Sequence, residues 1–263
     1  CIRDSIIGYA GSRGCAVRGT YGEGSQAVGG FYQVSNQVTL GASAAELTDK
    51  LVETGLKDAG YEYVVIDDCW ALRERDKNGK LVPDPEKFPH GMKYVADYIH
   101  KKGLKFGMYS CCGTMTCAGY PASYDHEFID AATFAEWGVD FLKYDYCFRP
   151  SATGGKLLYR RMGLALANCG RDILFSGCSW GADNTHEWIG TTGANMWRST
   201  GDSFDTWESL KSLILAQYDI LPFGGQGCFN DMDMLIVGMN GRGHVGLKGC
   251  CLLYTSPSPR DGA

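Results

Sequence analysis

The sequence lacks a long apolar run, a cluster of basic residues and any tight metal-ligand spacing. No apolar stretch approaches the ~20 residues of a membrane-spanning helix, so we expect no membrane span. Positive charge is scattered in a chain of formal net charge −5, and such a pattern does not neutralise several phosphates, which argues against nucleic acid as a partner. Neither C-x-x-C nor H-E-x-x-H occurs, so we predict no metal centre and no cofactor.

With 263 residues, 36 glycines and 44% hydrophobic content, the chain can bury one large core, which is typical of a single α/β domain. Twelve cysteines are many for a cytosolic protein. They favour the secretory pathway, with a secreted, lysosomal or vacuolar destination, although residues 1–15 show no signal peptide.

Helical and strand periods alternate from Ala44 onward, which predicts a parallel sheet covered by helices. The first unit has Leu47, Leu51, Val52 and Leu56 on one helical face, then a strand over 61–68. The other predicted strands cover 104–110, 139–145, 172–179, 194–202 and the segment around 228–238, with helices over 94–99, 125–137, 156–169 and 205–217. Six βα units are therefore predicted.

Polar side chains gather at the carboxyl end of every predicted strand. A (β/α)8 barrel builds its site there from loops after many strands, whereas an open doubly wound sheet uses one switch point. The distribution favours the TIM barrel. The strand-end residues are Asp67, Asp68, Tyr109, Lys143, Asp145, Ser179, Trp180, Arg198, Asp202, Asp231 and Asp233.

Both ends of the chain break this pattern. Residues 1–43 show no convincing period, and the run CLLYTSPSPRD at 251–261 reads like a translated sequencing adapter. We expect an atypical, mis-framed segment at 1–43, a partial catalytic barrel at 44–249 and an adapter-derived tail at 250–263. A barrel lacking its first and eighth strands exposes unpaired edges, so we expect residues 1–263 alone to be inactive.

Two aspartates, Asp145 in FLKYDYC and Asp202 in MWRSTGD, each close an apolar segment. A carboxylate at the end of a buried strand is costly to desolvate, so enzymes keep one where its charge is used. Such a pair suggests glycoside hydrolysis, in which one carboxyl group attacks and the other protonates the leaving oxygen. The alternative is that both are capping residues.

The segments YVVIDDCW (63–70), KYDYC (143–147) and WRSTGD (197–202) together resemble glycoside hydrolase family 27, over about residues 44–248. This is the family of α-galactosidases and α-N-acetylgalactosaminidases, which are retaining enzymes. The resemblance implies a (β/α)8 barrel followed by a small antiparallel β-domain, and we expect the eighth strand and that second domain to be missing from residues 1–263. It assigns the nucleophile to Asp145 and the general acid/base to Asp202, and implies release of terminal α-D-galactose from oligosaccharides, glycolipids or glycoproteins.

Charge neighbours should give the two carboxyl groups different protonation states: Lys143 would help hold the nucleophile ionised, while Asp202 keeps a proton. The resemblance also implies the sugar contacts. Asp67 and Asp68 would accept hydrogen bonds from the 4- and 6-hydroxyl groups of galactose, and Trp180 would form an aromatic wall. Further sugar contacts are carried over to Tyr109, Lys143, Arg198, Asp233 and Met234. The expected partners are glycans bearing α-galactose, with a homodimer as the assembly to test.

The same resemblance predicts a disulfide between Cys117 and Cys147. The family partner of Cys69 has no match here, and Cys15 is a weak candidate. Our interpretation of the remaining cysteines is that they are small buried hydrophobic residues. These are Cys111, Cys112, Cys169 and Cys228.

The tract CSWGA at 178–182 bears on the substrate. Animal α-galactosidases place glutamate and leucine where this chain has Ser179 and Ala182, and the α-N-acetylgalactosaminidases place serine and alanine. Smaller side chains leave room for a 2-acetamido group, whose carbonyl the Ser179 hydroxyl can bind. The continuation GADNTHEW is closer to plant and fungal loops. Galactose is therefore the first prediction, with N-acetylgalactosamine as the alternative.

Two rival classes of function remain. GRGHVG at 241–246 fits a dinucleotide-binding pattern, but no acidic residue follows about 20 positions later in the required context. A sugar-binding module without catalysis is the other rival, and the presence of both Asp145 and Asp202 favours catalysis over it.

Overall fold

The computed structural model describes residues 27–28, 31–32, 40–58, 60–204 and 206–233. Within them, six parallel strands form one sheet in the order β3-β4-β5-β6-β7-β8, so each strand pairs with the next one along the chain. A short antiparallel pair, β1 with β2, forms a separate sheet. The strands are β1 (Ala27–Val28), β2 (Phe31–Tyr32), β3 (Tyr63–Val65), β4 (Lys105–Cys111), β5 (Phe141–Asp145), β6 (Leu174–Cys178), β7 (Met196–Arg198) and β8 (Phe229–Asp231).

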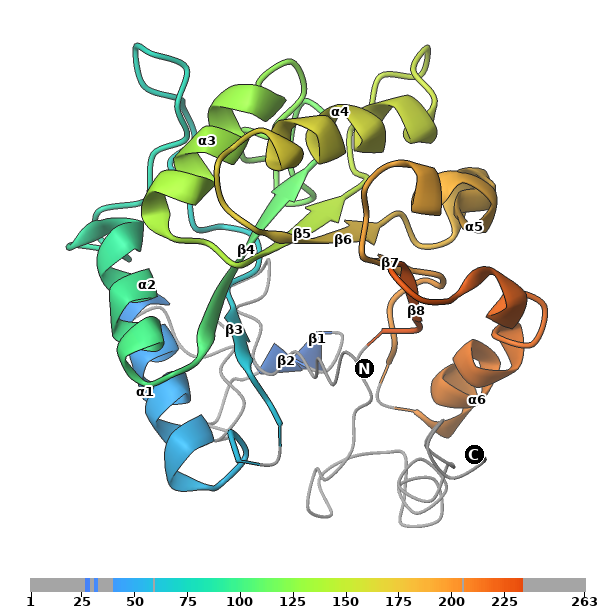
Figure 1. Cartoon of the computed structure of the whole chain (residues 1–263), viewed down its shortest axis with the longest axis horizontal. Helices are drawn as coiled ribbons and strands as arrows, with labels where there is room; N and C mark the ends of the chain where they lie inside the picture. Colours follow the sequence, from blue (N-terminus) through green and yellow to red (C-terminus); the bar gives the residue numbers. More distant parts are fainter. Residues whose placement is uncertain (1–26, 29–30, 33–39, 59, 205, 234–263) are drawn as a thin grey trace.

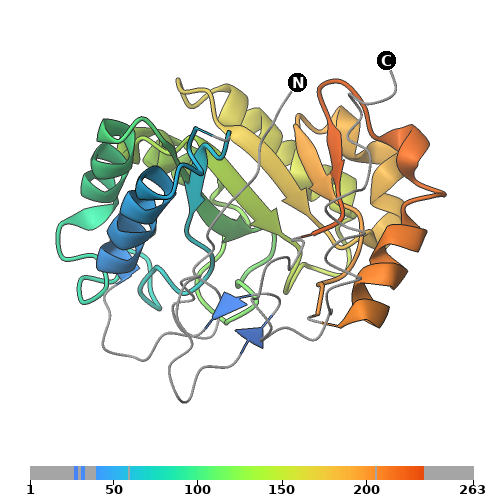
Figure 2. The ribbon, with the colours of Figure 1, turned by 90° about the horizontal axis from the view of Figure 1, so that it is seen from below.

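Helices connect these strands and lie along the outer side of the curved row of strands (Figures 1 and 2). The α-helices are α1 (Leu40–Glu53), α2 (Gly91–Lys101), α3 (Glu127–Trp137), α4 (Gly155–Ala167), α5 (Thr185–Trp188) and α6 (Trp207–Ala216), and the 3-10 turns are η1 (Ala182–Asn184), η2 (Ile189–Thr191) and η3 (Leu221–Phe223). The arrangement is that of a (β/α) barrel, which confirms the predicted fold class.

All six predicted βα units are present, with differences at their edges. The strand predicted over 61–68 is paired only at Tyr63–Val65, and that over 194–202 only at Met196–Arg198. Val52, placed on the buried helical face, is 38% exposed. The tail at 250–263 and most of the segment at 1–43 lie outside the described residues.

Strand residues alternate between two apolar clusters, because successive side chains point to opposite faces of a sheet. Val64 and Ile66 belong to the large core between sheet and helices. Tyr63 and Val65 instead pack with Phe141 in a small cluster on the inner face. Lys143 and Asp145 lie two and four residues after Phe141 on β5, so they share its inward-facing side. The strand period therefore aims both polar side chains into the barrel mouth.

Helix α4 approaches the chain that precedes β7 so closely that only glycine fits at position 163. A Cβ built on Gly163 would lie 1.9 Å from the main-chain oxygen of Thr192. Glycine normally weakens a helix interior by about 1 kcal/mol relative to alanine. Here close packing reverses that preference.

We expect Gly163→Ala to destabilise the protein by about 1–3 kcal/mol, because the backbone of Thr192 must shift to admit the methyl group. The free energy of unfolding in urea measures the effect. Gly190→Ala is the matched control, since a Cβ at this exposed position in η2 would meet only Cys228 Cβ at 4.0 Å. Equal stabilities of the two variants would contradict this account of the packing.

Candidate active site

Asp145 is the last residue of β5 and is 5% exposed. Its Oδ2 accepts a hydrogen bond from the Tyr109 hydroxyl at 2.9 Å, and its Oδ1 accepts from the main-chain N–H of Tyr146 at 2.9 Å. Tyr109 comes from β4, and Lys143 pairs with it across the strands. Two fixed donors thus orient a carboxylate that water barely reaches.

Burial dominates the electrostatics of Asp145. Desolvation raises its pKa from 3.8 to about 6, while the charge of Lys143 and the hydrogen bonds from Tyr146 and Tyr109 lower it. The prediction that Lys143 helps to hold Asp145 ionised is confirmed, because the charge of Lys143 lowers this pKa, although burial has the larger effect. Lys143 Nζ also donates a hydrogen bond to Asp67 Oδ2 at 2.7 Å.

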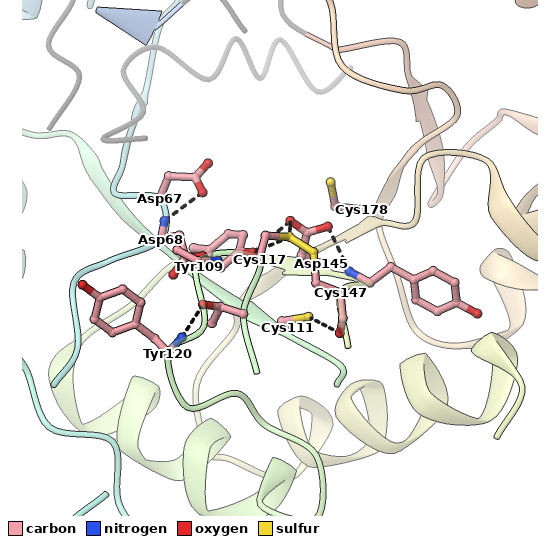
Figure 3. Close-up of a disulfide and its surroundings, with 12 residues drawn as sticks. Asp67, Asp68, Tyr109, Cys111, Cys117, Tyr120, Asp145, Cys147 and Cys178 are labelled. Carbon is pink, nitrogen blue, oxygen red and sulfur yellow. Dashed lines mark hydrogen bonds between the residues drawn. A yellow bond between two sulfur atoms is a disulfide. The ribbon is translucent and has the colours of Figure 1, made fainter. Parts of the chain in front are cut away.

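Asp67 and Asp68 follow β3, where the strand bends into its loop, and both are buried. Asp67 Oδ1 accepts from the main-chain N–H of Asp68 at 2.8 Å. Asp68 accepts from the main-chain N–H groups of Cys69 at 2.7 Å and Ala118 at 2.9 Å. Burial raises the pKa of Asp68 despite these donors. Besides its own loop, Asp67 is thus held by Lys143 of β5 and Asp68 by the loop after β4, and Figure 3 shows both carboxylates in one group with Tyr109 and Asp145.

The predicted disulfide between Cys117 and Cys147 is confirmed. It joins the loops after β4 and β5 and lies beside the nucleophile candidate, with Cys117 Sγ 3.3 Å from Asp145 Oδ2 (Figure 3). These two sulfurs and Asp145 are a grouping of metal-ligand types among the described residues. Because both sulfurs are in the disulfide, they are not available as thiolate ligands.

The other cysteines largely follow the prediction of small buried hydrophobic residues. Cys111 and Cys112 are fully buried, and Cys169 and Cys228 are partly buried against the main core. Cys15, the candidate partner of Cys69, lies outside the described residues.

Arg198 ends β7 and organises the opposite side of the site. Its side chain is 6% exposed, and its guanidinium contacts Asp233 at 2.9 Å and Asp202 at 3.1 Å. Asp202 lies four residues beyond the end of β7 with a side chain 66% exposed. The prediction that it closes a buried strand is therefore wrong: it sits on the following loop. Met234 and the GRGHVG segment lie outside the described residues.

The loop after β6 carries the specificity candidates. Ser179 is fully buried, and its hydroxyl shares a hydrogen bond with Thr185. Thr185 also donates to the main-chain oxygen of Ala182. Trp180 is 37% exposed. Ser179 therefore holds the loop together, while Trp180 offers its ring to solvent.

This loop also stores backbone strain. Trp180, Asp183 and Asn184 have φ values of 58°, 54° and 51°, a region that side chains other than glycine rarely adopt. Such residues cost on the order of 1 kcal/mol each and persist where surrounding contacts hold them. Asp183 was not singled out from the sequence. It accepts a hydrogen bond from the Tyr146 hydroxyl, and the only available signal was the position of Tyr146 directly after Asp145.

Comparison with known proteins now decides the family. A family model described as Alpha galactosidase A matches residues 36–247. The chain belongs to this family. The resemblance to glycoside hydrolase family 27 is thereby confirmed. A second model, described as ATP:guanido phosphotransferase, C-terminal catalytic domain, matches residues 3–57, which overlaps the segment that departs from the barrel pattern.

Individual proteins similar to this chain support the same family. It is 47% identical to an alpha-galactosidase of Oryza sativa subsp. japonica over 199 residues, 74% of this chain and 47% of that protein. It is 42% identical to an alpha-N-acetylgalactosaminidase of Gallus gallus, covering 80% of this chain and 54% of that protein. The structure of alpha-galactosidase I from Mortierella vinacea matches with a TM-score of 0.73 at 33% identity, over 81% of this chain and 63% of that chain. The chain spans about half the length of the first three curated relatives.

The raised pKa of Asp145 predicts a pH-dependent contribution to stability. Between pH 3.8 and about 6 the folded state binds a proton that the unfolded state has released, so stability falls as pH rises through this window. Asp145→Asn cannot titrate. We expect its free energy of unfolding to improve relative to the parent by roughly 2–3 kcal/mol between pH 4 and pH 7.

Urea unfolding at several pH values measures this difference. Asp172→Asn serves as a control, because Asp172 is exposed and precedes β6 at the other end of the sheet. If the parent and Asp145→Asn curves run parallel across the window, the burial argument is wrong.

Proposed function

We propose that the protein hydrolyses terminal, non-reducing α-D-galactose residues with retention of configuration. The observation that carries the proposal is the buried Asp145 carboxylate, fixed by Tyr109 and Tyr146 in a mouth that also holds Asp67 and Asp68. The names of the relatives from rice and Mortierella vinacea support the same reaction.

In this mechanism Asp145 attacks the anomeric carbon and forms a glycosyl-enzyme ester. Asp202 protonates the departing oxygen, then removes a proton from the water that hydrolyses the ester. The exposure of Asp202 on a loop suits these roles, because the leaving group departs to solvent and the water arrives from it. Arg198 binds one oxygen of Asp202 and so restricts its orientation.

Galactose recognition falls to the two other buried carboxylates. Each oxygen of a carboxylate has two acceptor positions. Asp67 uses one for Asp68 and one for Lys143, and Asp68 uses one each for Cys69, Ala118 and the Thr116 side chain. Acceptor capacity therefore remains for the 4- and 6-hydroxyl groups. Tyr109, Lys143, Arg198, Asp233 and Met234 are the further proposed contacts, with Trp180 as the wall.

Galactose is favoured over N-acetylgalactosamine as the sugar. The acetamido hypothesis uses the Ser179 hydroxyl as a hydrogen-bond partner of the acetamido carbonyl, whereas this hydroxyl is buried and bonded to Thr185. Ala182 likewise engages Thr185 through its main-chain oxygen. The chicken relative is named as an alpha-N-acetylgalactosaminidase, so hydrolysis of α-N-acetylgalactosaminides is the alternative that the test below includes.

The proposed setting is the secretory pathway, where α-galactosyl glycans are available as substrates. The disulfide between Cys117 and Cys147 supports an oxidising compartment. None of the helices in the described part of the chain is long and apolar enough to cross a membrane.

The test compares kcat/KM on the nitrophenyl α-galactoside and the nitrophenyl α-N-acetylgalactosaminide. It uses protein expressed from the complete reading frame that contains this chain, with Asp145→Asn as the blank. We expect the galactoside to be preferred at least about tenfold, because no free hydroxyl at Ser179 receives the acetamido group. Comparable turnover of both sugars would support the alternative, and no turnover above the blank would refute the proposal.

A second prediction separates the two carboxylates. Asp202→Asn should lower kcat/KM on a galactoside with an alkyl leaving group by about 10²–10⁴-fold, since such an oxygen needs a proton as it departs. Nitrophenolate leaves without this help, so its hydrolysis should be much less affected at the glycosylation step. Equal losses of kcat/KM on the two substrates would show that Asp202 is not the general acid.

A further inference from the structure

Tyr146 links the nucleophile candidate to the loop after β6. Its main-chain N–H donates to Asp145 Oδ1 at 2.9 Å, and its hydroxyl donates to the Asp183 carboxylate. One residue thus contacts Asp145 through its backbone and the loop through its side chain. Gly155 permits this packing, because a Cβ there would lie 2.3 Å from the Tyr146 hydroxyl.

Asp183 is held from two sides, through its carboxylate and through its main-chain oxygen. Besides the Tyr146 hydroxyl, it is paired with Arg149, whose Nη2 lies 3.4 Å from Oδ1. The Arg149 guanidinium also sits 4.6 Å from the centre of the Tyr146 ring, within the range of a cation–π contact. On the other side, Trp188 Nε1 donates to the main-chain oxygen of Asp183 at 2.7 Å. Asp183 is therefore a specific anchor, although its side chain is partly exposed.

The anchored loop presents Trp180 in a strained conformation. Trp180 and Asp183 both have positive φ, and such backbone persists only where contacts hold it. The Trp180 ring lies edge-on to the Tyr146 ring, with centroids 6.3 Å apart and an interplanar angle of 76°. Close approach also fixes the loop at Gly181, where a Cβ would lie 2.4 Å from the Ser199 oxygen. Tyr146 therefore contacts both Asp145 and Trp180 and connects their positions.

We propose that Tyr146 and Asp183 form a positioning pair that sets the distance and tilt of Trp180 relative to Asp145. The side-chain contact of the pair acts on sugar binding rather than on bond cleavage, because it supports the wall of the site, while Tyr146 contacts Asp145 only through its main-chain N–H. Arg149 supports it by neutralising Asp183. This inference rests on the proposed galactosidase function and adds to it the residues that shape the sugar wall.

The test is a double-mutant cycle of Tyr146→Phe and Asp183→Ala in the complete protein. Each single variant should raise KM for the nitrophenyl α-galactoside by about fivefold and keep kcat within about twofold, because a binding wall has loosened. The double variant should be no worse than Asp183→Ala, since both changes remove the same hydrogen bond. Asp172→Ala is the matched control for loss of an aspartate and should leave both constants unchanged.

Asp183→Asn distinguishes charge from hydrogen bonding, because its amide oxygen still accepts from Tyr146 while the pairing with Arg149 is lost. We expect the KM of Asp183→Asn to stay close to that of the parent. Additive effects in the cycle, or a fall in kcat at unchanged KM, would overturn the proposal.

A second readout does not depend on turnover. The acrylamide quenching of Trp180, taken as the difference between each protein and its Trp180→Phe counterpart, should increase in Asp183→Ala. Unchanged quenching would overturn the positioning role even in a parent that hydrolyses galactosides. If quenching increases in Asp183→Ala but the parent protein does not hydrolyse galactosides, the positioning pair is supported and only the proposed function is refuted.

Discussion

Burial of negative charge at the carboxyl ends of the strands is the constraint on which the site depends. Asp67, Asp68 and Asp145 are each 5% exposed or less, and the ammonium group of Lys143 bonds to one of them. An isolated carboxylate in such surroundings would take up a proton or pull in water. Main-chain N–H groups and the Tyr109 hydroxyl donate further hydrogen bonds to these carboxylates, which keeps the carboxylates oriented before any ligand binds.

The parallel register explains how these groups reach one place. Cys111, Asp145 and Cys178 are paired across β4, β5 and β6. Tyr109 and Lys143 are paired two residues earlier on β4 and β5. Each pairing brings together residues that are more than 30 positions apart in the chain. The disulfide joins the loops after β4 and β5 at the same edge of the sheet and so restrains both loops next to the charged residues.

Much of the fold was predictable because helices and strands have different periods and glycine marks many of the turns. The six units, the inward side of Lys143 and Asp145, and the apolar character of Cys111 and Cys112 follow from local pattern. The disulfide followed from family resemblance alone. Strand ends were less predictable, since a strand stays paired only as far as its neighbours do. The strand predicted over 61–68 accordingly pairs at three residues.

The amino-acid sequence by itself determined the order of βα units, the family and the identities of the charged residues at the strand ends, because these depend on short-range pattern and chemistry. Tertiary structure decided how those charges interact. Lys143 pairs with Asp67, burial raises the pKa of Asp145 against the lysine's effect, and Ser179 turns its hydroxyl to Thr185. The contact of Tyr146 with Asp183 spans 37 positions. Such outcomes depend on which groups from distant loops arrive at the same depth, and desolvation at that depth has no counterpart in the local sequence.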